Sequence, residues 1–369
     1  MTVRRAIGAA LSVLLWATVN EPALAQDVPQ NARDLKLFRF ALDNDGFLGS
    51  DDAFTAGWSV QLHSPLYDEW PANLERWVGR VPGLDDDGPG ARVVRRAWGL
   101  TQLILTPQDI TAVRPQPSDV PWAGLFGGYL SWSSYDNERL GALQVYFGCL
   151  GSCSHAEEVQ KLIHNSLGWG DAPEGWPNQL ADKPLVNVNY EYRRKLWASG
   201  SYDPRRWSHD LSVGAQAGLG SFATYAQVWL EYRFGWDVPE GFTNLADPPA
   251  LGVALDPVYV PPGAGARERT WRPYFSVVAR ARSLGRFAPL EGGETDNGYF
   301  QPPLESTPGG RQILFGIHVT KVPLAFHLTY YGFLDADAFP AGVQDQLDWV
   351  NFSFERRFGR RGVQAQRGF

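Results

Sequence analysis

The segment 185–197 constrains the fold most strongly, because its side chains alternate between two chemical classes. One face is apolar and aromatic and the other is polar or charged: Val186, Val188, Tyr190 and Tyr192 against Asn187, Asn189, Glu191 and Arg193. A period of two residues indicates a β-strand. An aromatic face opposite a face that carries Glu beside Arg is typical of a membrane barrel, with lipid outside and a polar lumen. A soluble β-sandwich would show the same alternation with its apolar face inward.

A second segment, 55–63, repeats this alternation, with Trp58, Val60 and Leu62 on one face. The composition favours the barrel, because aromatic residues make up 13 % of the chain, with 15 Trp, 14 Tyr and 20 Phe. Tyr and Trp concentrate where a membrane meets water. The net charge is −7 and the chain has no basic stripe, so we expect no nucleic-acid partner.

The N-terminus has the three parts of a secretory signal peptide. Arg4 and Arg5 precede an uncharged apolar run over residues 6–19, and Ala23-Leu24-Ala25 gives a small-x-small cleavage pattern. The run is shorter than the roughly 20 residues that span a bilayer. We therefore predict a signal peptide over 1–25, and one barrel domain over 26–369 in a Gram-negative outer membrane, as a monomer.

The fold class that we predict is all-β: a transmembrane antiparallel β-barrel of about twelve strands with long outer loops. The predicted strands are 35–43, 55–64, 97–106, 122–134, 139–148, 184–197, 207–219, 223–236, 270–283, 311–320, 323–333 and 347–358. An even number places both termini on the periplasmic side. The outer loops are then 44–54, 107–121, 149–183, 284–310 and 334–346.

Two long connections and a pair of cysteines lie between the predicted strands. The stretches 65–96 and 237–269 are long for periplasmic turns, so either the strand count is wrong or they carry plug-like or helical pieces. Cys149 and Cys153 lie in one outer loop of an exported chain, and an oxidising compartment favours a local disulfide between them.

Polar residues that could carry chemistry come together at the predicted outer rim. Asn44 and Asp45 end the first strand, Thr55 begins the second, and His164 lies in the third outer loop. Carboxylate and amide oxygens suit Ca²⁺, and a neutral His beside such a cation can act as a general base on water in ester hydrolysis. Acidic loops are more often solvated turns, and a loop His is more often a surface or packed residue.

The stretch 157–164 has helical spacing. Val159, Leu162 and Ile163 fall on one side, at i, i+3 and i+4. An apolar side of this kind needs a surface to pack against. We therefore expect a short helix that lies across the mouth of the barrel.

Three stretches resemble motifs of the outer-membrane lipid A 3′-O-deacylase family: Asn44-Asp45, Phe54-Thr55-Ala56-Gly57, and Glu158-Val159-Gln160-Lys161-Leu162-Ile163-His164. The resemblance extends to 102–107, to 122–124 and to the final strands. Members of that family are twelve-stranded barrels that use Ca²⁺ to hydrolyse the 3′-acyloxyacyl ester of lipid A. The resemblance implies catalytic roles for four residues, with His164 as the base: Asn44, Asp45, Thr55 and His164.

The sequence departs from the family pattern at one functional position. The Glu that follows the His by six residues in the family falls on Gly170 here, with Asp171 next to it. The metal-ligand candidates are therefore Asp45 and Asp171, and Ca²⁺ is the expected cofactor. A Ca²⁺-dependent ester hydrolase acting on lipid A is the leading hypothesis. The alternatives are a passive outer-membrane porin or channel and an outer-membrane phospholipase.

Overall fold

The computed structural model describes residues 32–44, 54–85, 92–167, 171–199, 207–236, 238–245, 247, 251–258, 271–304, 309–321, 323–334 and 348–359. The predicted signal peptide, 1–25, lies outside these ranges. No helix within them is both long and apolar enough to span a membrane.

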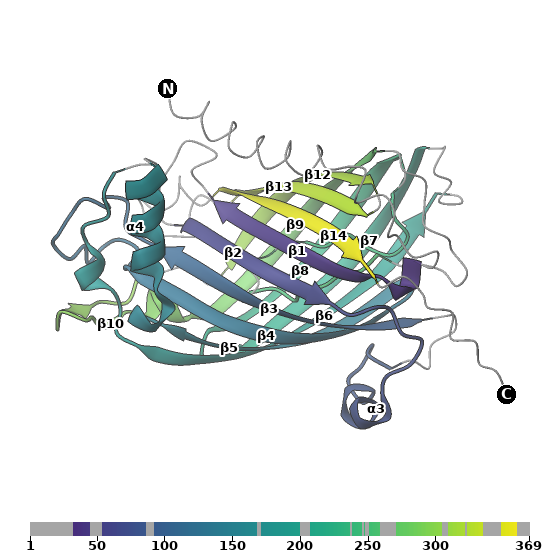
Figure 1. Ribbon diagram of the computed structural model, residues 1–369, viewed down its shortest axis with the longest axis horizontal. Helices are drawn as coiled ribbons and strands as arrows, with labels where there is room; N and C mark the ends of the chain where they lie inside the picture. The colour runs from purple at the N-terminus through teal and green to yellow at the C-terminus, as the bar shows by residue number, and fades with distance from the viewer. Residues whose placement is uncertain are drawn as a thin grey trace.

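Twelve antiparallel strands form a closed barrel, in which β1 (Lys36–Asn44) pairs with β14 (Trp349–Phe358) to complete the wall (Figure 1). The other strands of the wall are β2 (Phe54–His63), β3 (Val93–Leu105), β4 (Ala123–Tyr135), β5 (Arg139–Leu150), β6 (Lys183–Ala198), β7 (Trp207–Gly220), β8 (Ala223–Trp236), β9 (Arg272–Phe287), β12 (Gly309–Lys321) and β13 (Leu324–Phe333). Two short strands, β10 (Gly293–Glu294) and β11 (Phe300–Gln301), pair in the loop after β9. The predicted class and strand count are confirmed, and each boundary differs from its prediction by at most four residues.

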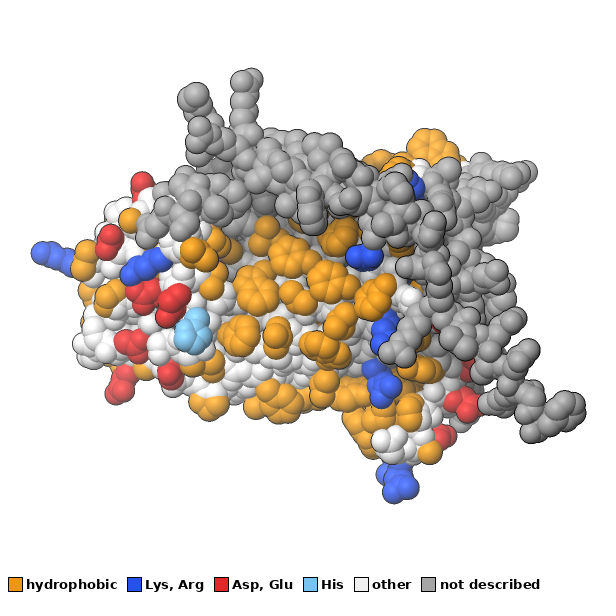
Figure 2. Space-filling view, in the orientation of Figure 1, with side chains coloured by type: hydrophobic (Ala, Val, Ile, Leu, Met, Phe, Trp, Pro, Cys, Tyr) orange, Lys and Arg blue, Asp and Glu red, His pale blue; other side chains and the backbone are white. Residues whose placement is uncertain are grey.

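Side chains that alternate along each strand lie in turn on the outer surface of the wall and in the lumen. On β6, Val186 and Val188 are exposed on the outside, whereas Asn187 and Asn189 are buried in the lumen. Hydrophobic side chains cover much of the middle of the wall (Figure 2). Because the barrel is closed, every strand finds a partner on both sides, as a lipid environment without water requires.

The lumen is filled by the connection between β8 and β9, whose described residues 238–245, 247 and 251–258 we call the luminal segment. Arg39 of β1 donates to the Leu255 carbonyl over 2.6 Å, and Gln144 of β5 donates to the Gly252 carbonyl over 2.6 Å. Ser131 of β4 donates to the Ala254 carbonyl over 2.8 Å. Lumen-facing donors from different strands thus hold the segment inside, and the predicted plug-like piece is confirmed.

Ion pairs anchor the luminal segment to the wall. Asp256 accepts two hydrogen bonds from Arg357, of 2.7 and 2.9 Å, and also pairs with Arg95. Asp247 lies 2.6 Å from a guanidinium nitrogen of Arg280. A charge inside a protein is tolerated when an opposite charge and hydrogen bonds replace its water. The acidic residues of the segment therefore match the basic residues of the lumen.

The other long connection carries a helix outside the barrel, α3 (Ala72–Val78). Trp70, Val78 and Leu84 pack with Val94 of β3, and Trp132 of β4 joins the same cluster. Val94 lies on the outside face of its strand, so α3 rests against the outer wall near the end where β2 stops and β3 begins (Figure 1). The predicted helical piece is confirmed.

We predict that Asp256→Ala destabilises the barrel strongly. The change leaves the buried guanidiniums of Arg95 and Arg357 without their carboxylate, which costs about 3–5 kcal/mol. Urea unfolding in detergent micelles, followed by heat-modifiable migration on gels, measures the effect. Asp68→Ala is the control, because the Asp68 side chain is 75 % exposed in its pair with Arg33 and its loss costs about 1 kcal/mol or less. Equal destabilisation by the two changes would contradict the anchoring role of Asp256.

Candidate active site at the outer end of the wall

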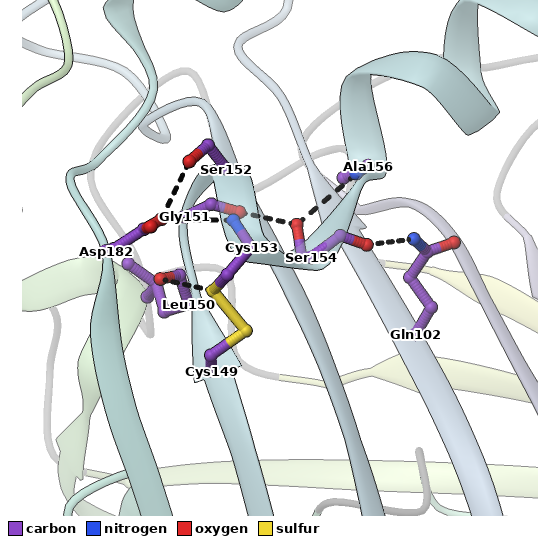
Figure 3. The surroundings of a disulfide bond; sticks show 9 residues. All are labelled: Gln102, Cys149, Leu150, Gly151, Ser152, Cys153, Ser154, Ala156 and Asp182. Atoms are coloured by element: carbon purple, nitrogen blue, oxygen red, sulfur yellow. Dashed lines mark hydrogen bonds between the residues drawn. A yellow bond between two sulfur atoms is a disulfide. The ribbon is translucent and has the colours of Figure 1, made fainter.

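The loop after β5 is fixed by a disulfide before it enters helix α4 (Ala156–Leu167). Cys149 and Cys153 are bonded, as predicted (Figure 3). The Cys153 amide donates to the Asp182 carboxylate over 3.1 Å, and the Ser154 hydroxyl donates to the Gly151 carbonyl over 2.6 Å. This short turn therefore sets the position at which α4 begins.

Helix α4 packs against the outside of the wall. Its residues Ala156 and Val159 contact a cluster that contains Ile104 of β3, Trp122 and Trp176. Ile104 falls on the same face of β3 as Trp98 and Leu100, which are exposed on the outer surface. The prediction of a helix across the barrel mouth is therefore wrong, since the apolar side of α4 finds its partner on the outer surface of β3 and β4.

Gly124 allows the start of α4 to approach β4. A Cβ at this position would overlap the Ser154 hydroxyl and the Ala156 methyl group. The ring of Trp122, two residues earlier, packs on Trp176 with centroids 5.0 Å apart. Residues 122–124, to which the family resemblance extends, thus form the surface on which the start of α4 packs.

Gln102 links two strands to the turn before α4. Its side-chain oxygen accepts a hydrogen bond of 2.8 Å from the Trp58 indole of β2. Its amide nitrogen donates to the Ser154 carbonyl over 2.7 Å (Figure 3). Gln102 therefore holds the rim of β2, β3 and the helix as one unit.

His164 lies near the end of α4 and is only 7 % exposed. Its Nδ1 is 2.7 Å from the Asp171 carbonyl oxygen. A carbonyl oxygen can only accept a hydrogen bond, so Nδ1 carries the proton. In the neutral ring, Nε2 then holds the free electron pair, which is the form that a general base needs.

Gln160 lies one helical turn before His164 on the same face of α4. It is 2 % exposed, and its oxygen accepts a hydrogen bond of 2.7 Å from the Trp176 indole. Its amide nitrogen is buried and has no hydrogen-bond partner among the described residues. Gln160 was not among the predicted site residues, although its spacing of four residues from His164 places both on one face of a helix.

The other predicted residues are placed less completely. Asn44 is the last residue of β1, half-buried, opposite Val350 of β14. Thr55 lies in β2 where the register with β3 shifts, and its side chain is outside the described part, as is the whole of Asp45. Asn44 and the backbone of Thr55 share the barrel end that carries α4, and the structure joins Asp171 to His164 through its carbonyl.

The electrostatics of this end favour cations. Burial and the nearby carboxylates of Asp182 and Glu157 raise the pKa of Asp296 in the outer loops. Acidic side chains gather over the loops around α4 (Figure 2). Within the described ranges, no three His, Cys, Asp or Glu side chains are close enough to hold a metal ion. Of the predicted site residues, Asp171 with its exposed carboxylate and Asn44 with its amide are described and offer oxygen ligands.

Comparisons with known proteins decide the family. The model of the family described as Outer membrane protein LpxR matches residues 10–358. The chain belongs to this family. The resemblance to the lipid A 3′-O-deacylase family is thereby confirmed, and the chain is an outer-membrane protein.

The solved structures agree with this membership. "LpxR from Salmonella typhimurium" is 14 % identical, with a TM-score of 0.64 over 87 % of this chain and 99 % of that chain. At this identity the likeness shows the fold alone. The β domain of the Bordetella autotransporter BrkA is 10 % identical over 88 % of this chain and 98 % of that one, with a TM-score of 0.43, too low to support a conclusion. No curated protein matches the chain in sequence.

We predict that Gly124→Ala displaces α4 and leaves the barrel folded. The added methyl group overlaps the start of the helix, and such overpacking costs about 1–3 kcal/mol. Limited proteolysis of the loop 149–183 should become about tenfold faster, with unchanged heat-modifiable migration. Gly128→Ala is the control, because its Cβ would meet its nearest atoms at 3.4 Å. Unchanged proteolysis of Gly124→Ala would show that the helix does not need this close approach.

Proposed function

We propose that this LpxR-family protein is a Ca²⁺-dependent lipid A 3′-O-deacylase, an ester hydrolase that releases the 3′-linked acyloxyacyl chain in the outer leaflet. The observation that carries the proposal is His164, held by the Asp171 carbonyl in the form in which Nε2 can accept a proton. Family membership supports the substrate class.

The position of α4 supports a substrate that comes from the membrane. The helix lies on the outside of β3 and β4, next to the exposed apolar surface of the wall. A lipid in the outer leaflet therefore reaches the side of the barrel without leaving its layer. Leu100 and Trp58, on the outside faces of their strands, are placed to contact its acyl chains.

The proposed reaction is a direct attack of water on the ester. His164 Nε2 removes a proton from water, whose oxygen bonds to the ester carbonyl carbon. Collapse of this intermediate breaks the bond to the 3′ oxygen, which takes the proton from His164. The products are the acyloxyacyl carboxylic acid and a 3′-hydroxyl. The buried amide nitrogen of Gln160 lies on the same helix face as His164 and has no hydrogen-bond partner among the described residues.

The residues at this rim fit a Ca²⁺ site by their chemistry, since Asn44, Asp45 and Asp171 all offer oxygen ligands. When bound there, the cation would stabilise negative charge on the ester oxygen. Asp171 provides a carboxylate one residue after Gly170, where the family has Glu. Its carbonyl orients His164, so this one residue would connect the base to the cation.

The porin alternative has less support. The luminal segment occupies the lumen and is bound to the wall by buried ion pairs. A closed barrel of this size filled by its own residues leaves no wide aqueous path. The phospholipase alternative shares the chemistry of the site, so only a comparison of substrates separates it from the deacylase.

We predict that His164→Ala lowers deacylation by at least about 100-fold, because it removes the general base. Mass spectrometry of lipid A from expressing cells measures the loss of the acyl unit, and purified protein with a glycerophospholipid tests the alternative substrate. His155→Ala is the matched control, since its side chain is exposed at the start of the same helix. Full activity of His164→Ala would contradict the mechanism.

We predict that the purified protein loses activity in EGTA and regains it when Ca²⁺ is added. Asp171→Asn should raise the Ca²⁺ concentration for half-maximal activity by about tenfold or more, because a carboxylate ligand is lost. Asp109→Asn, at an exposed acidic residue of another outer loop, should leave that concentration unchanged. Activity that is insensitive to EGTA would exclude Ca²⁺ from the reaction.

A further inference from the structure

A groove lies on the outside of the wall at the end opposite α4. Its volume is about 610 Å³, within the range of about 300–1,000 Å³ that small-molecule sites occupy. The wall side is formed by β1 to β4 and by Phe358 of β14, and Tyr67 and Leu74 from the connection that carries α3 form the other side. Short turns follow β4 and β12 at this end, which identifies it as periplasmic.

Two cations lie at the floor of the groove, on either side of Ser64. Lys36 of β1 and Arg96 of β3 are exposed, on the faces of their strands that point to lipid. Ser64 lies between them, and its amide and hydroxyl both bond the backbone of Arg96, over 2.8 and 3.1 Å. Neighbouring strands are about 4.8 Å apart, so the two cations stand roughly 10 Å apart at their backbones.

Neither cation is neutralised by a carboxylate in the part of the chain that the structure describes. Arg96 lies over the Tyr67 ring, with 5.8 Å between the guanidinium carbon and the ring centroid. Because Tyr67 and Arg96 both line the groove, this contact keeps the guanidinium beside it. Lys36 pairs across the strands with Phe358, whose ring also lines the groove. The pair is therefore available to an anion that enters from the membrane.

An apolar surface continues from the cations towards the middle of the membrane. Leu62, Trp98 and Leu130 are adjacent on β2, β3 and β4, one step further along the outside face. Trp98 is 50 % exposed. On the other side, Trp77 of α3 packs edge-on against Trp132, with centroids 5.1 Å apart, which fixes the helix to the wall.

We propose that this groove binds a glycerophospholipid with a net anionic headgroup, from the periplasmic leaflet. Lys36 and Arg96 take the phosphate, and the acyl chains follow Leu62, Trp98 and Leu130. The position of the two cations across the membrane favours the periplasmic leaflet. Arg96 is six residues from Gln102 on β3, about 20 Å along the strand from the rim that holds α4. In Figure 2, Lys and Arg side chains mark the edge of the hydrophobic field near α3.

Lysine and arginine at a membrane boundary also contact lipid headgroups without forming a site. The proposal for the groove differs from such contacts, because it predicts that one lipid molecule is retained at one place. The control must therefore keep the charge and depth and lack the groove. Arg139 and Arg194 meet these conditions, since they are opposite each other on β5 and β6 at the periplasmic end and do not line the groove.

Native mass spectrometry of the purified full chain in detergent tests the proposal, with phosphatidylglycerol as probe and phosphatidylcholine as comparison. The parent should retain one phosphatidylglycerol as detergent is exchanged. The double variant Lys36→Gln/Arg96→Gln should bind it at least tenfold more weakly, and Arg139→Gln/Arg194→Gln should bind it within twofold of the parent. Heat-modifiable migration confirms that each variant is folded, and all should keep lipid A deacylation.

Three results would overturn the proposal. Undiminished retention by Lys36→Gln/Arg96→Gln would remove the role of the two cations. Equal loss in both double variants would reduce the effect to surface charge. Displacement of the bound lipid by purified lipid A, at one molecule for one, would assign the groove to an outer-leaflet lipid instead. None of these depends on whether the protein is a deacylase.

Discussion

The pairing of β1 with β14 is the constraint on which the rest of the structure depends. Residues 36–44 meet 350–358 in an unbroken register, and this pairing leaves the wall without a free edge. In lipid, an unpaired backbone N–H or C=O costs several kcal/mol, so an open sheet of these strands would not persist. Closure also divides every strand into a lipid face and a lumen face, and the sequence must satisfy both.

The lumen face explains why the candidate site lies elsewhere. Its guanidiniums and carboxylates pair with one another and with Asp247 and Asp256 of the luminal segment. Removing one member leaves an uncompensated charge, so this interior is costly to alter. The outer surface of the wall, by contrast, has apolar side chains against which helix α4 packs. Single hydrogen bonds, such as those from Gln102 to the Ser154 carbonyl and from Trp176 to Gln160, add polar links to α4 and its turn.

Much of the fold follows from the sequence, because alternation is a direct consequence of two-sided strands. The predicted strand 223–236 coincides with β8, and the length of 237–269 left open either a wrong strand count or a plug-like or helical piece. The position of α4 did not follow. The spacing of Val159, Leu162 and Ile163 shows that one side of the helix is apolar, but not which surface receives it, and Leu162 is in fact exposed.

The site shows the same limit at the level of single atoms. The motif resemblance identified His164. Its Nδ1, however, donates to the backbone carbonyl of Asp171, and the identity of the Asp171 side chain carries no information about that contact. The buried amide of Gln160 depends on the ring of Trp176, which lies 16 residues away in the chain. Contacts of this kind are set by the path of a loop, and no periodic pattern encodes that path.

Helices α3 and α4 both rest on the same sector of the wall, at its two opposite rims. Another barrel that approached this sector in a crowded membrane would meet the two helices before it met the strands between them. The strands between the helices would therefore stay in contact with lipid. Lateral neighbours would then pack on other sides of the cylinder, which would leave this sector open to diffusing lipid.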